Sequence, residues 1–138
     1  MTTTFYLQDE TKIDPTVAHA YVAGWINAGT SSFQVLQSNG TFGGSSPTSI
    51  PFYLVSSVPS VTLDSPDLGG NRLVFLVSPT PPAALGVANG QAPIQYAQYP
   101  YQGPPGAAGA PGPFDIFEFG LGGQDDVSAV SGFGLNLR

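Results

Sequence analysis

The sequence contains no cysteine and very few basic residues, and both shortages narrow the possible functions. Without cysteine the chain can form neither disulfides nor thiolate metal sites. Lys12, Arg72 and Arg138 stand against nine acidic residues, which gives a formal net charge of −6. Nucleic acids and anionic membrane surfaces both attract clustered lysine and arginine. The sequence therefore predicts a protein that binds neither nucleic acid nor a membrane.

Motifs for cofactors, metals and export are equally scarce. His19 is the single histidine, so neither a histidine metal site nor a Ser-His-Asp triad is expected. The stretch Gly120–Gly123 lacks the lysine and following helix of a phosphate loop. Asp115, Glu118 and Asp125-Asp126 offer oxygen ligands but no calcium-loop spacing. We expect no cofactor and no metal. The N-terminus shows no signal peptide, and no apolar run reaches the roughly 20 residues of a membrane span.

Glycine and proline are abundant, and the composition favours strands over helices. The chain has 18 glycines and 14 prolines among 138 residues, while the helix formers lysine, glutamate and methionine are scarce. Its length is typical of one domain with a hydrophobic core. The sequence predicts a single all-β domain over 1–138, an antiparallel β-sandwich. The expected strands are 2–8, 18–26, 32–37, 50–56, 60–64, 71–78, 114–121 and 126–137.

Two short patterns indicate special backbone geometry within these strands and turns. Asn39-Gly40 favours a tight hairpin turn, because glycine supplies the positive φ angle that such turns need. Gly24 lies inside an expected strand and indicates a bulge or close packing. His19 and Trp25 are interpreted as a strand residue and a core residue. The segment 41–49 is expected to be a loop.

A long loop is expected from Pro79 to Pro113, where proline, glycine and alanine dominate. Glycine recurs at every third position over 103–112, as in a collagen triple helix, but three triplets are too few for a stable one. A surface loop is the preferred interpretation, with a small trimerising element as the alternative. Tyr96, Tyr99 and Tyr101 could pin this loop to the sheet or form an aromatic platform for a sugar ring.

Glu118 lies among apolar residues near the C-terminus, in the stretch Phe114–Leu121. Alternation along a strand puts Phe114, Ile116 and Glu118 on one face, and Asp115, Phe117 and Phe119 on the other. Glu118 is therefore either a solvated residue at the strand rim or a partly desolvated carboxylate suited to acid catalysis.

The same region resembles a known family. Phe117-Glu118-Phe119, followed by Asp126-Val127-Ser128-Ala129-Val130 and then Gly132-Phe133, looks like a stretch shared by thaumatin-like proteins and bacterial β-1,3-glucanases of the thaumatin-type sandwich. The segments 22–42 and 71–78 are similar to an early hairpin and a central strand of that superfamily. The resemblance implies a thaumatin-like sandwich, here reduced to its core domain.

The resemblance also implies an acidic cleft for a polysaccharide. Carried over singly, Glu118 and Asp126 take two acidic positions of that cleft, and Arg72 is the arginine available beside them. A third acidic position of the family reads Ser131 here. Because family members continue into a second domain that forms the other wall, a chain ending at Arg138 is expected to form a half-cleft.

These residues lead to three functional hypotheses. The preferred one is a non-catalytic module that binds β-1,3-glucan or a related polysaccharide through Arg72, Glu118 and Asp126, with Tyr96, Tyr99 and Tyr101 as stacking surfaces. An alternative is a β-1,3-glucanase in which Glu118 is the acid and Asp126 the base. A third is a self-assembling subunit, whose first strand pairs with another copy through open strand edges. An extracellular or cell-surface location is favoured.

Overall fold

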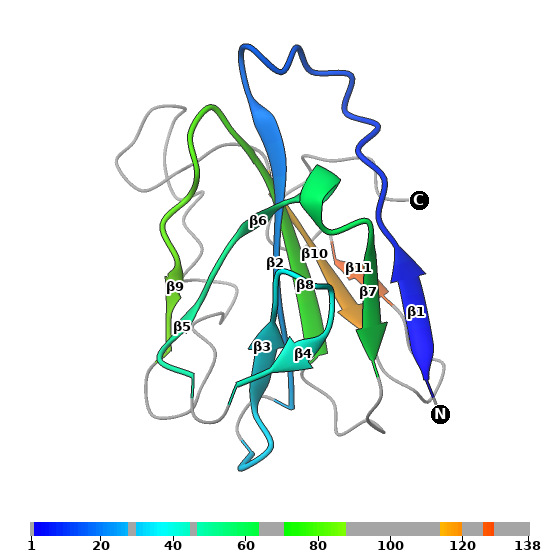
Figure 1. Cartoon of the computed structure of the whole chain (residues 1–138), viewed down its shortest axis with the longest axis vertical. Helices are drawn as coiled ribbons and strands as arrows, with labels where there is room; N and C mark the ends of the chain where they lie inside the picture. The colour runs from blue at the N-terminus through cyan, green and yellow to red at the C-terminus, as the bar shows by residue number, and fades with distance from the viewer. Residues whose placement is uncertain are drawn as a thin grey trace.

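The described part of the chain folds into antiparallel β-sheets (Figure 1). A computed structural model describes residues 2–27, 30–44, 47–63, 71–87, 114–119 and 126–128. Within these ranges one short 3-10 turn accompanies the strands, and no helix is long and apolar enough to cross a membrane. The prediction of an all-β fold is confirmed.

The strands form one large sheet and two small ribbons. The large sheet has the order β11-β10-β8-β2-β3-β4, with β6 also paired to β2, and the ribbons are β1-β7 and β5-β9. The elements are β1 (Thr3–Tyr6), β2 (His19–Ile26), β3 (Gln34–Leu36), β4 (Phe42–Gly43), β5 (Ser49–Ile50), β6 (Tyr53–Leu54), the 3-10 turn η1 (Val55–Ser57), β7 (Ser60–Leu63), β8 (Asn71–Ser78), β9 (Leu85–Gly86), β10 (Phe114–Phe119) and β11 (Asp126–Ser128).

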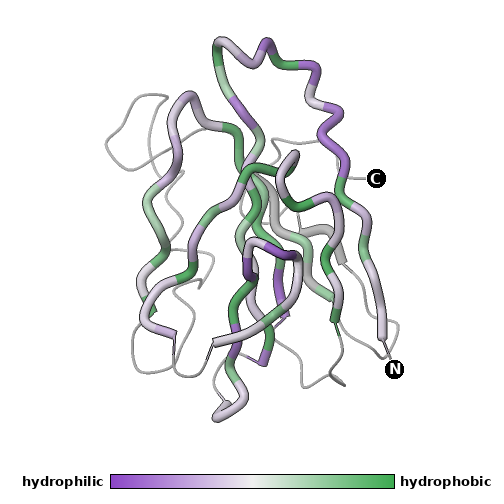
Figure 2. The backbone as a smooth tube through the Cα atoms, in the orientation of Figure 1, coloured by the Kyte–Doolittle hydropathy of each residue, from purple (hydrophilic) through white to green (hydrophobic). Residues whose placement is uncertain are grey.

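The centre of the large sheet is the antiparallel pair β2-β8. Its register runs through seven residue pairs, from His19 opposite Ser78 to Trp25 opposite Arg72. β2 is buried at every position from Tyr21 to Ile26, and β8 is buried at most positions, which is the pattern of strands covered on both sides. Figure 2 shows this apolar centre, and it shows hydrophilic residues concentrated in the segment that joins β1 to β2.

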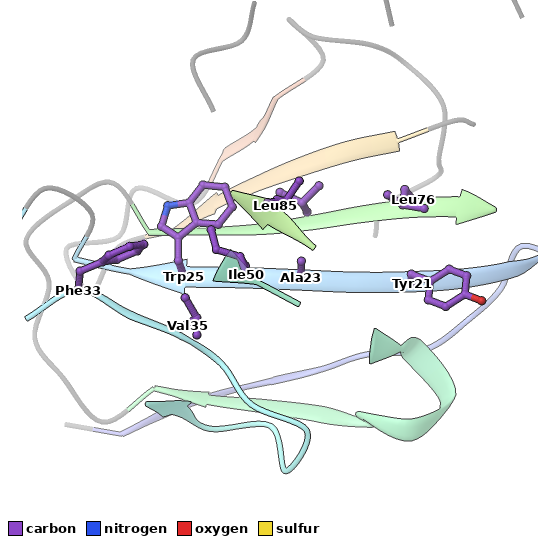
Figure 3. Close-up of a cluster of buried hydrophobic side chains, with 9 residues drawn as sticks. Tyr21, Ala23, Trp25, Phe33, Val35, Ile50, Leu76 and Leu85 are labelled. Atoms are coloured by element: carbon purple, nitrogen blue, oxygen red, sulfur yellow. The ribbon is translucent and has the colours of Figure 1, made fainter. Parts of the chain in front are cut away.

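One face of β2-β8 packs against the β5-β9 ribbon and forms the Trp25 core. Trp25 is 1% exposed, and Ile50 of β5 and Leu85 of β9 contribute from the ribbon (Figure 3). Fully burying one such side chain contributes roughly 1.5–3 kcal/mol. The interpretation of Trp25 as a core residue is confirmed. The buried members of the Trp25 core are Tyr21, Ala23, Trp25, Phe33, Val35, Ile50, Val74, Leu76 and Leu85.

The opposite face packs against the β1-β7 ribbon and forms the phenylalanine core. Phe5 of β1 meets Phe117 and Phe119 of β10 edge-on, with ring centroids 5.4 and 5.2 Å apart. The ring centroids of Phe42 and Phe119 are 6.3 Å apart. The buried members of the phenylalanine core are Val22, Ile26, Leu36, Val55, Val58, Val61, Leu63, Leu73 and Phe119. Phe117 and Phe119 therefore anchor β10 on this side, as the predicted alternation requires.

Glycine has a definite role at two positions. Gly24 allows close packing of β2 on β8, because a Cβ there would lie 2.6 Å from Leu73 Cδ2 and 3.0 Å from the Arg72 carbonyl oxygen. Gly40 has a φ of 80° in the turn between β3 and β4, and its N–H donates to the Gln37 carbonyl at 3.0 Å. The prediction of a tight Asn39-Gly40 turn is confirmed, and Gly24 marks close packing.

Several predicted boundaries are wrong. The expected loop 41–49 contains β4 and the first residue of β5, and the expected loop 79–113 contains β9. The expected strand 50–56 is divided into the end of β5, β6 and η1, because Pro51 has no N–H to continue a ladder. Strands of two residues carry no periodic signal. They form only because a distant partner lies beside them, as Ser49 and Ile50 do for β9.

Gly24→Ala tests the close contact between β2 and β8. We expect a loss of about 1–3 kcal/mol in unfolding free energy, because the added methyl group overpacks against Leu73. Urea unfolding measures the change. Gly86→Ala is the matched control, since a Cβ there meets nothing within 4 Å, and its effect should stay within about 0.5 kcal/mol. Equal stabilities for the two variants would contradict the packing argument.

Candidate functional site

The three predicted charged residues occupy one row of the large sheet. Arg72 on β8 is directly paired with Glu118 on β10, and Glu118 is directly paired with Asp126 on β11. On its other side Arg72 is paired with Trp25 of β2. Residues directly opposite each other in antiparallel strands share a face, with Cβ atoms about 4.5–5.5 Å apart. We call the positions Arg72, Glu118 and Asp126 the charged row.

The register places the charged row on the same face of the sheet as the Trp25 core. Trp25 and Val74 belong to that core. Arg72 is directly paired with Trp25 and lies two residues before Val74 on β8. Arg72 is half-buried, and its Nε atom is buried. The hydrocarbon part of the Arg72 side chain therefore extends the apolar surface of the Trp25 core. The guanidinium group of Arg72 places a positive charge at the edge of that surface. The row begins at the edge of the core.

The local sequence explains why the row forms. Phe117 and Phe119 pack into the phenylalanine core on one face of β10, with their own rings 5.8 Å apart. Because side chains alternate along a strand, Glu118 between them belongs to the other face. On β8, Leu73 fills the phenylalanine core and Arg72 takes the opposite side. The hydrophobic side chains that pack on one face of the sheet thus determine which charged residues belong to the other face.

The charged row contains one pairing of positions that is unfavourable for the stability of the sheet. Arg72 opposite Glu118 is an opposite-charge pair, which stabilises a sheet by roughly 0.2–1 kcal/mol. Glu118 and Asp126 occupy directly opposed positions, and like charges at such positions destabilise a sheet by a similar amount. The row carries one positive and two negative formal charges, so it keeps a net negative charge in a protein with few charged residues.

Several other predicted site residues lie where the structure gives no description. Tyr96, Tyr99 and Tyr101 lie outside the described residues, as do Ser131 and the glycine triplets of 103–112. Asp115 is three positions from Glu118 on β10 and so belongs to the other face. Among the described residues no group of three metal-binding side chains occurs.

Polar residues of the segment before β2 have a structural role. The backbone N–H and hydroxyl of Thr16 both donate to Asp14 Oδ1 at 2.8 Å, and they lower the pKa of this exposed carboxyl group. Asp9 accepts the equivalent pair from Thr11. His19, at the start of β2, lies edge-on to Tyr21 at 6.4 Å and is the strand residue that was expected. Asp9 and Asp14 thus stabilise local turns of this segment.

Sequence reasoning missed one feature of the site region and one of the ribbon that covers the opposite face. Nothing in the sequence indicated that Trp25 adjoins Arg72, because that pairing joins strands far apart in the chain. It also missed Tyr6, which is 85% exposed on β1 beside the exposed Thr4. The alternation in 2–8 could have found this second feature, since Phe5 is the inward residue between the two.

Comparisons with known proteins give no relative. No protein-family model, curated protein or solved structure that was compared with the chain matches it.

Asp126→Asn tests the like-charge pair. We expect it to raise the free energy of unfolding by about 0.2–1 kcal/mol at low salt, because it removes the negative charge opposite Glu118. The gain should shrink at 1 M salt, where screening acts over only about 3 Å. Glu10→Gln, in the exposed segment before β2, removes the same charge away from the row and serves as the control. A variant no more stable than this control would remove the argument for repulsion.

Proposed function

We propose that the chain is a non-catalytic carbohydrate-binding module of the thaumatin-like type, with β-1,3-glucan or a related polysaccharide as its ligand. One observation carries the proposal: Arg72, Glu118 and Asp126 are directly paired in one row across three neighbouring strands. A polysaccharide ligand also favours an extracellular or cell-surface location.

The chemistry of the row suits sugar hydroxyl groups. A guanidinium group offers planar N–H donors and no acceptor, while ionised carboxylates accept hydrogen bonds only. Each hydroxyl group of a sugar both donates and accepts, so it can bridge a carboxylate and the guanidinium group. Adjacent strands lie about 4.8 Å apart, so the row spans roughly 10 Å, which is close to the length of two sugar rings. Trp25, directly opposite Arg72, is buried in the core and closes that end of the row.

Binding is favoured over cleavage by the composition of the row. A glycosidase needs one protonated carboxyl group to donate to the leaving oxygen. Arg72, directly opposite Glu118, instead supplies N–H donors that suit a bound hydroxyl group. Ser131 also stands where the resembling family has a further acid. The direct pairing of Glu118 with Asp126 nevertheless keeps a β-1,3-glucanase as the second candidate.

Self-assembly stays a separate prediction. The segment 2–8, expected to act as a donor strand, contains β1, which pairs with β7 of its own chain over four residue pairs. This pairing uses one side of β1 and gives the ribbon that covers the phenylalanine core.

Glucan binding should depend on all three positions of the row. We expect Glu118→Gln, Asp126→Asn and Arg72→Lys each to weaken binding to soluble laminarin about tenfold or more, because each loses a charge-assisted or bidentate hydrogen bond. Calorimetric titration measures the change, and urea unfolding checks that each variant is folded. Glu10→Gln should bind as the unmodified chain does. Undiminished binding by the row variants would overturn the proposed site.

Incubation with laminarin separates the binding module from the glucanase. We expect no release of reducing sugar above that of a sample without protein, because the row is proposed to bind the glucan without donating a proton to a leaving oxygen. Release that disappears in Glu118→Gln would contradict the non-catalytic proposal and establish the hydrolase.

A further inference from the structure

The turn between β3 and β4 carries an acceptor triplet for sugar attachment. Asn39-Gly40-Thr41 is the one place in the 138-residue sequence where an asparagine is followed two residues later by serine or threonine. Asn-X-Ser/Thr, with X other than proline, is the acceptor sequence for N-linked glycosylation. The triplet alone is a short and common pattern, so its structural setting decides whether it can act.

The structure sets the two essential side chains together and in the open. Asn39 and Thr41 are both exposed. The backbone N–H and the hydroxyl of Thr41 donate to Asn39 Oδ1 at 3.1 and 2.8 Å. A transferring enzyme must engage the asparagine amide and the hydroxyl group at the same time, and here they already lie side by side. Neither hydrogen bond involves Asn39 Nδ2, the atom that would carry the sugar.

The backbone of the turn is held from both sides. Gln37 N donates to the Thr41 carbonyl at 2.8 Å, and Gly40 N donates to the Gln37 carbonyl at 3.0 Å. Thr62 N on β7 donates to the Gly40 carbonyl at 2.8 Å. Gly40 is buried, and a Cβ there would overlap the carbonyl oxygen of Ser60. The middle residue of the triplet thus faces the protein while the outer two face solvent.

We propose that Asn39 is an N-glycosylation site of this protein. In the transfer, Asn39 Nδ2 forms a bond to the anomeric carbon of an oligosaccharide. The bond from that carbon to the diphosphate of a lipid carrier breaks, and Nδ2 loses one proton. The donor is thus a lipid-diphosphate-linked oligosaccharide, and the lipid diphosphate leaves with the bonding electrons. Asn27 and Asn71 are buried and lack the hydroxyl residue two positions later, so they do not compete.

The experiment incubates the folded, unmodified full chain with a purified oligosaccharyltransferase and a lipid-linked oligosaccharide. We expect one glycan on each chain, located at Asn39 by peptide mapping. Removal by peptide-N-glycosidase should leave aspartate at position 39. Thr41→Ser should retain transfer. Thr41→Val should reduce it at least tenfold, although it preserves the size of the side chain and the backbone hydrogen bond to Asn39 Oδ1.

Controls keep the test decisive. Circular dichroism and urea unfolding check that Thr41→Val is folded, and Ser38→Ala, an exposed neighbour in the same turn, should accept as the unmodified chain does. A chain unfolded in urea and diluted into the reaction provides the reference for the bare sequence. Transfer to the unfolded chain only, transfer at another asparagine, or equal transfer to Thr41→Val would each overturn the proposal.

Discussion

The pairing of β2 with β8 is the constraint on which the rest of the structure depends. Seven directly opposed residue pairs join the two strands, and each strand sends alternate side chains into two separate cores. The pair can lie close because Gly24 presents no side chain to Leu73 and the Arg72 backbone. The same register brings Trp25 beside Arg72. The close approach of β2 and β8 therefore determines both how the sheet packs and where the charged row begins, which is at Arg72.

The two cores have different consequences for the site. The phenylalanine core holds β10 through Phe117 and Phe119, which contact Phe5 of the β1-β7 ribbon. This packing determines which face of β10 carries Glu118. The Trp25 core lies on that face and ends at Arg72. A like-charge pair next to such a core costs stability that the hydrophobic contacts of the other face must offset.

The sequence predicted the elements whose signals are local. Residues 71–78 form a long apolar run and match β8 at both ends, and Asn39-Gly40 forms the turn that its dipeptide indicates. It failed for β4 and β9, whose two residues each are strands only because Leu36 or Ile50 lies opposite them. For the site, alternation placed Glu118 on its face. The pairing with Arg72 and Asp126 needed the register, which depends on packing between strands distant in the chain.

The two proposed carbohydrate contacts lie on different sides of the large sheet and do not conflict. Thr41 and Thr62 form an isolated β-bridge, and Thr62 N donates to the Gly40 carbonyl. The β3-β4 turn therefore packs against β7. β7 covers the face that holds the phenylalanine core. The charged row belongs to the opposite face, with the Trp25 core. The large sheet therefore separates the Asn39 turn from the charged row.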